Sequence, residues 1–400
     1  MPRTTSATSV PIHPYKRHPL PIYVTSLLLI FHSYLVAYIN SSFLEQFISA
    51  TEVGAVYIIG SALTVLIFLF ISRVLRKIGN YKWSLVLISL NFAAVAGMAY
   101  TNELRVAVPL FIIHLISVTL IFFNLDVFME EQIGINETTT GSKRGLLLTL
   151  ISLVGATSPL IGSLLVDGNE TAFTYPYLLS AATLIPVIII LLFFFRDFSD
   201  PEYNEIDIFS AIRSFWRSVS IRHVFLAHFA LQMFFMLMVV YIPIYLTKDI
   251  GLSWAEFGVV MFFGQLAYVV FEYPIGIIAD RYIGEKEMMG FGFLILIIST
   301  SWIAFVTSTS ILVWSIIMFV TRIGASLVEV TTESYFFKQT KSNDAQIISF
   351  FRITRPLAYV TGAILGSLAL LYVPFNLLFI VFTILFVPAM FGTINIIDTK

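Results

Sequence analysis

One arginine lies in the middle of a long apolar stretch. Arg322 comes about 11 residues after the stretch begins at Ile311, which at about 1.5 Å per residue of helix is about 16 Å, near the centre of a bilayer. A guanidinium at that depth costs several kcal/mol unless it is paired or faces water. Arg322 is therefore either a group that binds an anionic or hydroxyl-rich ligand, or one half of an ion pair that locks two helices together.

Carboxylates recur at i, i+4 spacing in both halves of the chain. Asp126 and Glu130 form one pair, Glu329 and Glu333 form the other, and Glu272 is a further acid in an apolar stretch. This spacing puts both members of a pair on one helix face, where two close carboxylates in a low-dielectric setting can hold a proton. The deepest three, Asp126, Glu272 and Glu329, are expected either to carry protons or to join a charge network at the inner membrane face. That network is expected to contain Glu130, Glu333, Arg352, Arg355, Lys143 and Arg144.

Uncharged polar residues also fall near the middle of apolar stretches. His32, His114, Gln232 and Gln265 are candidates to contact a substrate, or else they hydrogen-bond one helix to another. The chain has no cysteine, no spacing of histidines and carboxylates typical of a metal site, and no phosphate-binding loop. We therefore expect no metal and no cofactor, and any energy source must be a gradient.

The elements that position these residues are expected to be membrane-spanning helices. The mean hydropathy is +0.91, and 12% of residues are charged, against roughly 25% in soluble domains. A net charge of -1 gives no sign of nucleic-acid binding. About 20 apolar residues span a bilayer, and the stretches of that length lie at about 20–43, 50–72, 83–101, 105–129, 145–166, 174–195, 223–247, 254–279, 288–308, 311–335, 345–371 and 374–395.

The basic residues predict the orientation of these helices. If the N-terminus is inside, all of the 23 Lys and Arg residues except Arg105, Lys248 and Arg322 lie on the cytoplasmic side. Both termini are therefore predicted to be cytoplasmic, and we expect the plasma membrane as the location. Residues 1–19 lack the apolar core of a secretory signal and form a predicted cytoplasmic tail.

The two halves of the chain repeat each other with an offset of about 204 residues. Residues 51–60 match 255–264, and each match follows a capping box, formed by Ser49 and Glu52 or by Ser253 and Glu256. Charged residues concentrate in 196–222, where an amphipathic helix is expected after Asp207. The predicted domains are a bundle over 20–195, this linker over 196–222, and a second bundle over 223–400.

One loop carries a family signature. The segment Gly276-Ile-Ile-Ala-Asp-Arg-Tyr-Ile-Gly-Glu-Lys286 resembles the loop motif of the major facilitator superfamily, and the twelve helices and the repeat fit that family. The matching loop of the first half has Leu75 where the family has an aspartate. The motif residues are Gly276, Asp280, Arg281, Gly284 and Lys286.

The resemblance implies an all-α fold of two pseudo-symmetric six-helix bundles around a central cavity lined by helices one, four, seven and ten. It places Arg322 and His32 on cavity-lining helices. It also places Asp280 against the start of helix five near Lys143 and Arg144, as a latch of the inner side. Gly155, Pro159 and Gly162 on helix five faintly resemble the glycine–proline motif of drug–proton antiporters within the family.

These observations predict a secondary active transporter that moves a small molecule by alternating access, coupled to protons, with export slightly favoured. One alternative is an uptake symporter or facilitator for a sugar, peptide or metabolite. Another is a membrane receptor or assembly factor that transports nothing, although Arg322 and the deep carboxylates argue against a pure scaffold. The expected partners are a small-molecule substrate, protons and the lipid bilayer, and the expected state is a monomer. No nucleophile constellation indicates an enzyme.

Overall fold

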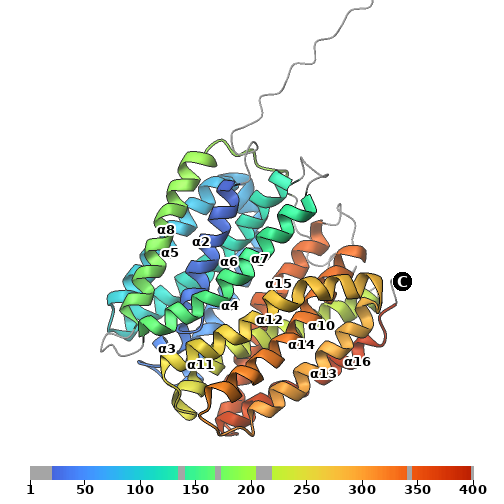
Figure 1. The fold of residues 1–400 in the computed structure, drawn as a ribbon. Helices are drawn as coiled ribbons and strands as arrows, with labels where there is room; N and C mark the ends of the chain where they lie inside the picture. The colour runs from blue at the N-terminus through green and yellow to red at the C-terminus, as the bar shows by residue number, and fades with distance from the viewer. Residues whose placement is uncertain (1–19, 134–139, 167–172, 204–218, 340–344, 398–400) are drawn as a thin grey trace, which may run out of the picture.

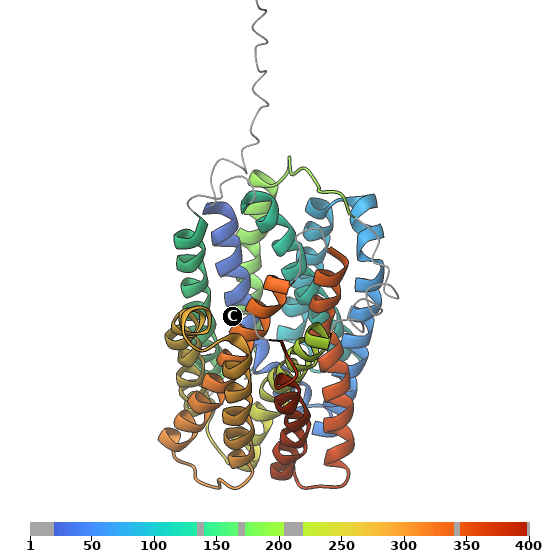
Figure 2. The same ribbon diagram turned by 90° about the vertical axis from the view of Figure 1, so that its right-hand side faces the viewer.

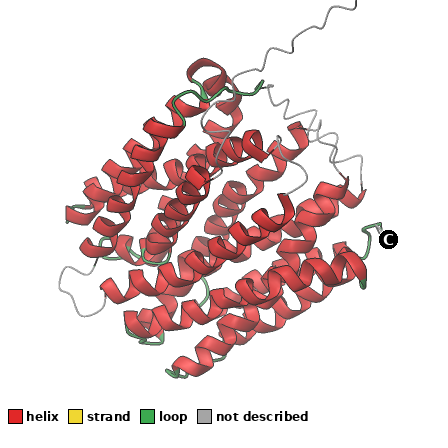
Figure 3. Ribbon diagram, turned by 45° about the horizontal axis from the view of Figure 1, so that its top comes forward, coloured by secondary structure: helices red, strands yellow, loops and turns green. Residues whose placement is uncertain are grey.

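The computed structural model describes residues 20–133, 140–166, 173–203, 219–339 and 345–397, and these contain helices and loops without any strand (Figure 3). The first bundle contains α2 (Leu20–Ala37), the short α3 (Asn40–Leu44), α4 (Ala50–Ile78), α5 (Asn80–Tyr100), α6 (Leu104–Ile133), α7 (Thr140–Val166) and α8 (Thr174–Phe194). The second bundle contains α10 (Val219–Met236), η2 (Leu237–Tyr241), α11 (Ile242–Ile244), η3 (Tyr245–Asp249), α12 (Trp254–Arg281), α13 (Glu285–Ile303), α14 (Ile311–Gln339), α15 (Ala345–Leu370), η4 (Phe375–Leu377) and α16 (Leu378–Thr393).

The long helices run roughly parallel to one another and are apolar enough to cross a bilayer (Figure 2). Eleven described segments satisfy both length and hydropathy for a membrane span. In α7 the apolar part is Leu150–Val166, which is shorter than the length required for this count. With α7 included, the long helices match the twelve that the sequence predicts. The protein is therefore an integral membrane protein with many spans. The amphipathic helix predicted after Asp207 lies outside the described residues.

Two predicted helices differ from simple α-helices. The first predicted span divides at Tyr38–Ile39 into α2 and α3. The seventh contains two π-helical turns, η2 and η3, on either side of Pro243. A proline removes a backbone donor and disturbs the regular ladder, and π-turns within α-helices are frequent at functional sites. The irregular part of this span faces the site described below.

The starts of the helices repeat between the bundles, as the sequence predicts. Ser49 and Glu52 form a capping box at the start of α4, and Ser253 and Glu256 form one at the start of α12. Gly79 before α5 and Gly284 before α13 have φ values of 83° and 106°, which L side chains rarely adopt. The capping boxes that the sequence predicts at the starts of α4 and α12 are confirmed.

The two bundles meet along two pairs of helices. Helix α7 packs on α12 and α4 packs on α15, whereas the other large interfaces lie within a bundle (Figure 1). The α4–α15 contact is close at Gly54, where a Cβ would lie 2.0 Å from Ser367 Oγ. The bundles thus approach each other closely along this seam.

The contacts between bundles are concentrated at one end of the molecule, the end where Glu45 follows α3. There Lys248 Nζ lies 3.0 Å from Glu45 Oε2, and Ser367 Oγ donates a hydrogen bond of 2.9 Å to the Thr51 carbonyl. The rings of Phe173 and Trp254 meet edge to face at 6.0 Å. We call this the Glu45 end and the opposite one, where α2 begins, the Leu20 end. The Glu45 end is closed.

Candidate functional site

A cavity lies between the two bundles. Its volume is about 340 Å³, within the range of small-molecule sites. The first bundle contributes residues from α2, α3, α4, α6 and α7, and the second contributes residues from α10, η2, α12, α14 and α15. Helices one, four, seven and ten all line it, as the family resemblance implies.

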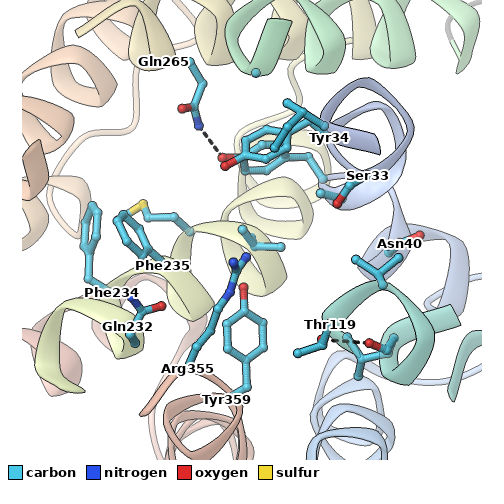
Figure 4. Close-up of a pocket in the computed structure, with 18 of the residues that line it drawn as sticks. Ser33, Tyr34, Asn40, Thr119, Gln232, Phe234, Phe235, Gln265, Arg355 and Tyr359 are labelled. Carbon is cyan, nitrogen blue, oxygen red and sulfur yellow. Dashed lines mark hydrogen bonds between the residues drawn. The ribbon is translucent and has the colours of Figure 1, made fainter. Parts of the chain in front are cut away.

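The cavity wall combines aromatic, polar and charged side chains (Figure 4). The predicted candidates that line it are Arg322, His114, Gln232, Gln265, Glu272, Glu329 and Arg355. The tyrosines that line it are Tyr34, Tyr38, Tyr57, Tyr268 and Tyr359. Such a wall suits a ligand that has a flat or ring-shaped apolar face together with hydrogen-bonding groups.

Arg322 is buried to 1% exposure, yet none of its described partners is an acid. Its Nη1 contacts the sulfur atoms of Met318 and Met238 at 3.2 and 3.4 Å, and the Thr321 hydroxyl at 2.9 Å. The guanidinium carbon lies 5.9 Å from the centre of the Phe234 ring. Thioether sulfur is a weak acceptor, so these contacts satisfy the cation only in part. This geometry disagrees with a structural ion pair and leaves an electropositive group at the cavity wall.

The second cation, Arg355, was expected in the inner charge network. The structure places it on the cavity wall, where its guanidinium lies beside the Tyr359 hydroxyl (Figure 4). Glu329 on α14 is close enough to Arg355 and Glu272 to interact with both through charge. The cation Arg355 and the two acids therefore lie close together in the cavity. A change in the charge of one of them alters the electrostatic energy of the others.

Two polar contacts cross the cavity from one bundle to the other. Ser152 Oγ on α7 donates to Glu272 Oε2 on α12 at 3.2 Å. Gln265 Nε2 on α12 donates to Tyr38 Oη on the first bundle at 2.5 Å (Figure 4). Because these bonds join the bundles, any relative movement of the bundles must change them.

Gln232 has one group left for a ligand. Its Nε2 is 3.2 Å from His228 Nε2, whereas its Oε1 is buried and has no partner among the described residues. A buried amide oxygen without a donor is costly. The cavity-lining position of Gln232 means that a bound solute can supply that donor.

The two predicted histidines occupy different layers. His114 lines the cavity, whereas His32 lies behind it and is not part of the described wall. Asn91 connects them, with its amide nitrogen 2.8 Å from His32 Nε2 and its amide oxygen 2.7 Å from His114 Nδ1. His32 Nδ1 in turn lies 3.0 Å from the Ser180 carbonyl oxygen. In the structure His32 thus has the role of a hydrogen-bonder between helices.

The remaining predicted residues lie towards the Leu20 end. Asp126 and Glu333 have interaction partners and do not line the cavity. Glu285, which lies within the segment of the loop motif, accepts a hydrogen bond from Ser334 and pairs with Lys338. The side chains of Glu130, Lys143, Arg144, Asp280 and Arg352 lie outside the described residues, so the predicted latch stays a prediction.

Several wall residues escape sequence reasoning. Tyr34 and Tyr38 are spaced i, i+4 at the end of the first span, and this pair could have been noticed as a polar edge on an apolar helix. Met238 gives no such signal, because methionine is an ordinary residue of an apolar helix. Ser152 is equally inconspicuous. Among the described residues, no cluster of His, Asp and Glu could hold a metal ion.

Comparison with known proteins identifies the architecture. Residues 224–396 match the sequence model of the Major Facilitator Superfamily, and no curated protein sequence matches the chain. The crystal structure of the nucleoside transporter NupG has the same fold, with a TM-score of 0.72 and 13% identity over 96% of this chain and 100% of that one. The crystal structure of a NupG mutant aligns with a TM-score of 0.73 and 12% identity over 96% and 99%. The second half of the chain therefore matches the major facilitator superfamily by sequence, and the whole chain has the fold of a known transporter. Both findings support a secondary transporter rather than an enzyme.

Proposed function

We propose that the protein carries a small polar solute that contains a ring through the cavity between its bundles, by alternating access and with protons as the coupling ion. The observation that carries this proposal is Arg322, a buried cation at the cavity wall that no described carboxylate neutralises. A cation in that position is stabilised when a solute supplies an oxygen acceptor or a negative charge. Substrate binding then compensates for a cost that the empty site bears.

The wall also supports a substrate class. Aromatic side chains such as Phe234, Phe235 and Tyr268 can pack on a ring, while Gln232 and Arg322 can bind hydroxyl, carbonyl or phosphate oxygens. Nucleosides combine a flat base with a hydroxyl-rich sugar, and NupG, which has the same fold, is a nucleoside transporter. We therefore propose nucleosides as the first class to test, with other hydroxyl-rich or anionic ring compounds next.

Proton coupling is supported by the acids of the second bundle. Glu272 and Glu329 line the same cavity as Arg355, and Glu272 also bonds to Ser152 across the bundle interface. An acid that lies between two moving bundles meets a different environment in each state, and this difference can link its protonation to the movement. Glu329 is the proposed proton carrier, and Glu272 is the proposed sensor of the interface.

The proposed orientation places the Leu20 end in the cytoplasm and both termini with it, in the plasma membrane, because the basic residues concentrate at that end. The closed Glu45 end then faces outwards. The preference for export depends on the glycines of helix five. A Cβ on Gly162 would lie 2.1 Å from the Leu35 carbonyl oxygen, so packing already explains this glycine. Uptake therefore stands beside export as the direction to be measured.

The deciding experiment uses purified protein in proteoliposomes with a pH gradient of either sign. Uridine, glucose, a dipeptide and a lipophilic cation are compared, first by thermal stabilisation and then by flux. Uridine is expected to stabilise the protein and to move against its gradient only when a pH gradient is present. Accumulation or depletion gives the direction. Stabilisation by the lipophilic cation alone would contradict the proposed substrate class, and flux that ignores the pH gradient would contradict the coupling.

A receptor or scaffold role makes a different prediction from the same experiment. A protein that binds without transporting would be stabilised by its ligand but would show no flux in either direction. Arg322→Ala provides the control, because it removes the proposed binding group and leaves the bundle contacts unchanged.

A further inference from the structure

The first bundle contains a continuous chain of hydrogen bonds that ends at the cavity. It begins at Ser180 on α8, passes through His32 on α2 and Asn91 on α5, and ends at His114 on α6. His32, Asn91 and His114 are exposed by 1%, 0% and 4%, so water does not compete for these bonds. We call these residues the histidine relay.

The direction of every bond in the relay follows from its first acceptor. A carbonyl oxygen cannot donate, so the hydrogen bond of 3.0 Å to Ser180 requires the proton of His32 to be on Nδ1. Neutral His32 then has an unprotonated Nε2, which must accept from Asn91. The Asn91 nitrogen lies 2.8 Å away and donates this bond.

The Ser180 hydroxyl agrees with this assignment. Its Oγ donates to the His32 carbonyl at 3.1 Å, and the same oxygen lies 2.7 Å from His32 Nδ1. Because a hydroxyl has only one proton, an Oγ that donates to the carbonyl can only accept from Nδ1. Both oxygen atoms of Ser180 therefore favour the proton on the same ring nitrogen.

Because the amide nitrogen of Asn91 points to His32, its amide oxygen points to His114. That oxygen lies 2.7 Å from His114 Nδ1 and can only accept, so the proton of His114 is also on Nδ1. Each amide and ring orientation is thus determined by its neighbour and not left to solvent.

We infer that the relay fixes His114 in the tautomer whose unprotonated Nε2 is presented to the cavity, and that this atom selects solutes carrying an N–H or O–H donor. His114 lines the cavity, and Nε2 has no partner among the described residues. His32 and Asn91 do not touch the solute and act as positioning residues. The inference rests on the proposed function for the use of the cavity as a binding site.

The opposite wall complements this acceptor. Gln232 Oε1 is a second acceptor without a described partner, and Arg322 is a cation. A solute that spans the cavity would donate to His114 and Gln232 and accept from Arg322. Hydroxyl groups and the N–H groups of nucleobases provide such donors. A site built around a donor rejects analogues that lack it, because its buried acceptor is then left unpaired.

The tautomer can be measured without any ligand. The full-length protein is labelled with ¹⁵N-histidine, and the ring signals of His32 and His114 are assigned with His32→Gln and His114→Phe. Both residues are expected to show a protonated Nδ1 and an unprotonated Nε2 at neutral pH. In Asn91→Leu, His114 is expected to exchange between tautomers. A wild-type His114 with a protonated Nε2 would overturn the inference.

Binding then tests selectivity with a matched set of uridine analogues. 2′-Deoxyuridine, 3′-deoxyuridine, 5′-deoxyuridine and 3-methyluridine each lack one donor. One of them is expected to bind wild type about tenfold more weakly than uridine, and His114→Phe is expected to remove that difference. Equal binding of all analogues by wild type would contradict the inference while leaving the transport proposal intact. Failure of uridine itself to bind would contradict the proposed substrate, and the ¹⁵N signals would still decide the relay.

Discussion

The two bundles solve the problem of buried polar groups in opposite ways. In the first bundle His32, Asn91 and His114 satisfy one another in a neutral chain that joins α2, α5, α6 and α8. In the second bundle Arg322 rests on two thioethers and a hydroxyl. The repeat pairs His114 with Met318, a contact of Arg322, so the two arrangements occupy related places.

This contrast indicates which bundle depends on the solute for stabilisation of its polar groups. A neutral network in which the described donors meet acceptors is stable when the cavity is empty, and it can present His114 rigidly. A cation with weak acceptors gains most when an oxygen arrives. The acids repeat the contrast, since Glu272 and Glu329 of the second bundle line the cavity and Asp126 of the first bundle does not. We infer that the second bundle carries the charge that binding and coupling require.

The largest effect is expected from neutralising the proposed proton carrier. Glu329→Gln keeps the shape of the side chain but cannot exchange a proton, so accumulation against a gradient should vanish while exchange of uridine across the membrane persists. Asp126→Asn, at the related place in the first bundle, is the matched control and should retain accumulation. Flux is measured in proteoliposomes per folded molecule. If Asp126→Asn lost accumulation and Glu329→Gln retained it, the proton carrier would lie in the first bundle and not in the second.

A smaller effect is expected where the bundles differ at the Leu20 end. At the start of α13, Glu285 is buried and pairs with Lys338, whereas at the start of α5 the side-chain amide of Asn80 donates to the Asn124 carbonyl at 3.1 Å. Lys338→Met should lower the unfolding free energy by about 1–2 kcal/mol, since Lys338 is half exposed and its bond is partly screened.

Asn80→Ala should cost about 1 kcal/mol or less, because a neutral hydrogen bond is lost. Thermal unfolding in detergent at low and high salt separates the two variants. High salt should reduce the difference in unfolding temperature between wild type and Lys338→Met. The difference between wild type and Asn80→Ala should stay unchanged. Equal salt dependence of both would mean that the charge of the second bundle does not matter at this end.

The smallest effect concerns the closed end, where one residue from each bundle meets. Burial raises the pKa of the Glu45 carboxyl, and the ammonium of Lys248 opposes part of that rise. The neighbouring Asp249 adds to it. In an opened state Glu45 would face water and recover its ordinary pKa of about 4.5. The closed state therefore binds the proton more tightly, and closure is favoured as the pH falls through the raised pKa.

The stabilisation of the closed state should reach its full value below about pH 4.5, because Glu45 is then protonated in both states. Distances between spin labels on the two bundles at the Glu45 end report the closed fraction against pH. Glu45→Gln should flatten the dependence, and Lys248→Met should move it to higher pH because the opposing charge is lost. A closed fraction that falls on acidification would contradict the sign.

Much of the fold follows from the sequence alone. The apolar stretches locate the helices because lipid demands them, and Ser49, Ser253, Gly79 and Gly284 mark helix starts by local chemistry. Arg322 is recognisable because a charge among apolar residues needs a reason. These signals are local, so no knowledge of packing is required to read them.

The rest of the site depends on packing that no local pattern contains. The relay brings together His32, Asn91, His114 and Ser180 from four helices. Asn91 reaches His114 Nδ1 only because α5 packs on α6. Depth along a helix placed His32 and His114 at similar levels but could not tell which one faces the cavity. Arg355 looked like an inner-face cation, yet the packing of α15 beside α4 places it on the wall.

The central claim is that Arg322 is held ready for a solute and does not hold the fold together. The most direct test compares wild type, Arg322→Lys and Arg322→Ala by thermal unfolding and by uridine binding on the same preparations. Arg322→Ala should unfold close to the wild-type temperature and bind about tenfold to hundredfold more weakly, with Arg322→Lys between them because it keeps the charge without the planar fork. If Arg322→Ala instead loses roughly 3–5 kcal/mol of stability, as removal of one partner of a buried ion pair does, while its folded fraction binds uridine as wild type does, the claim is wrong.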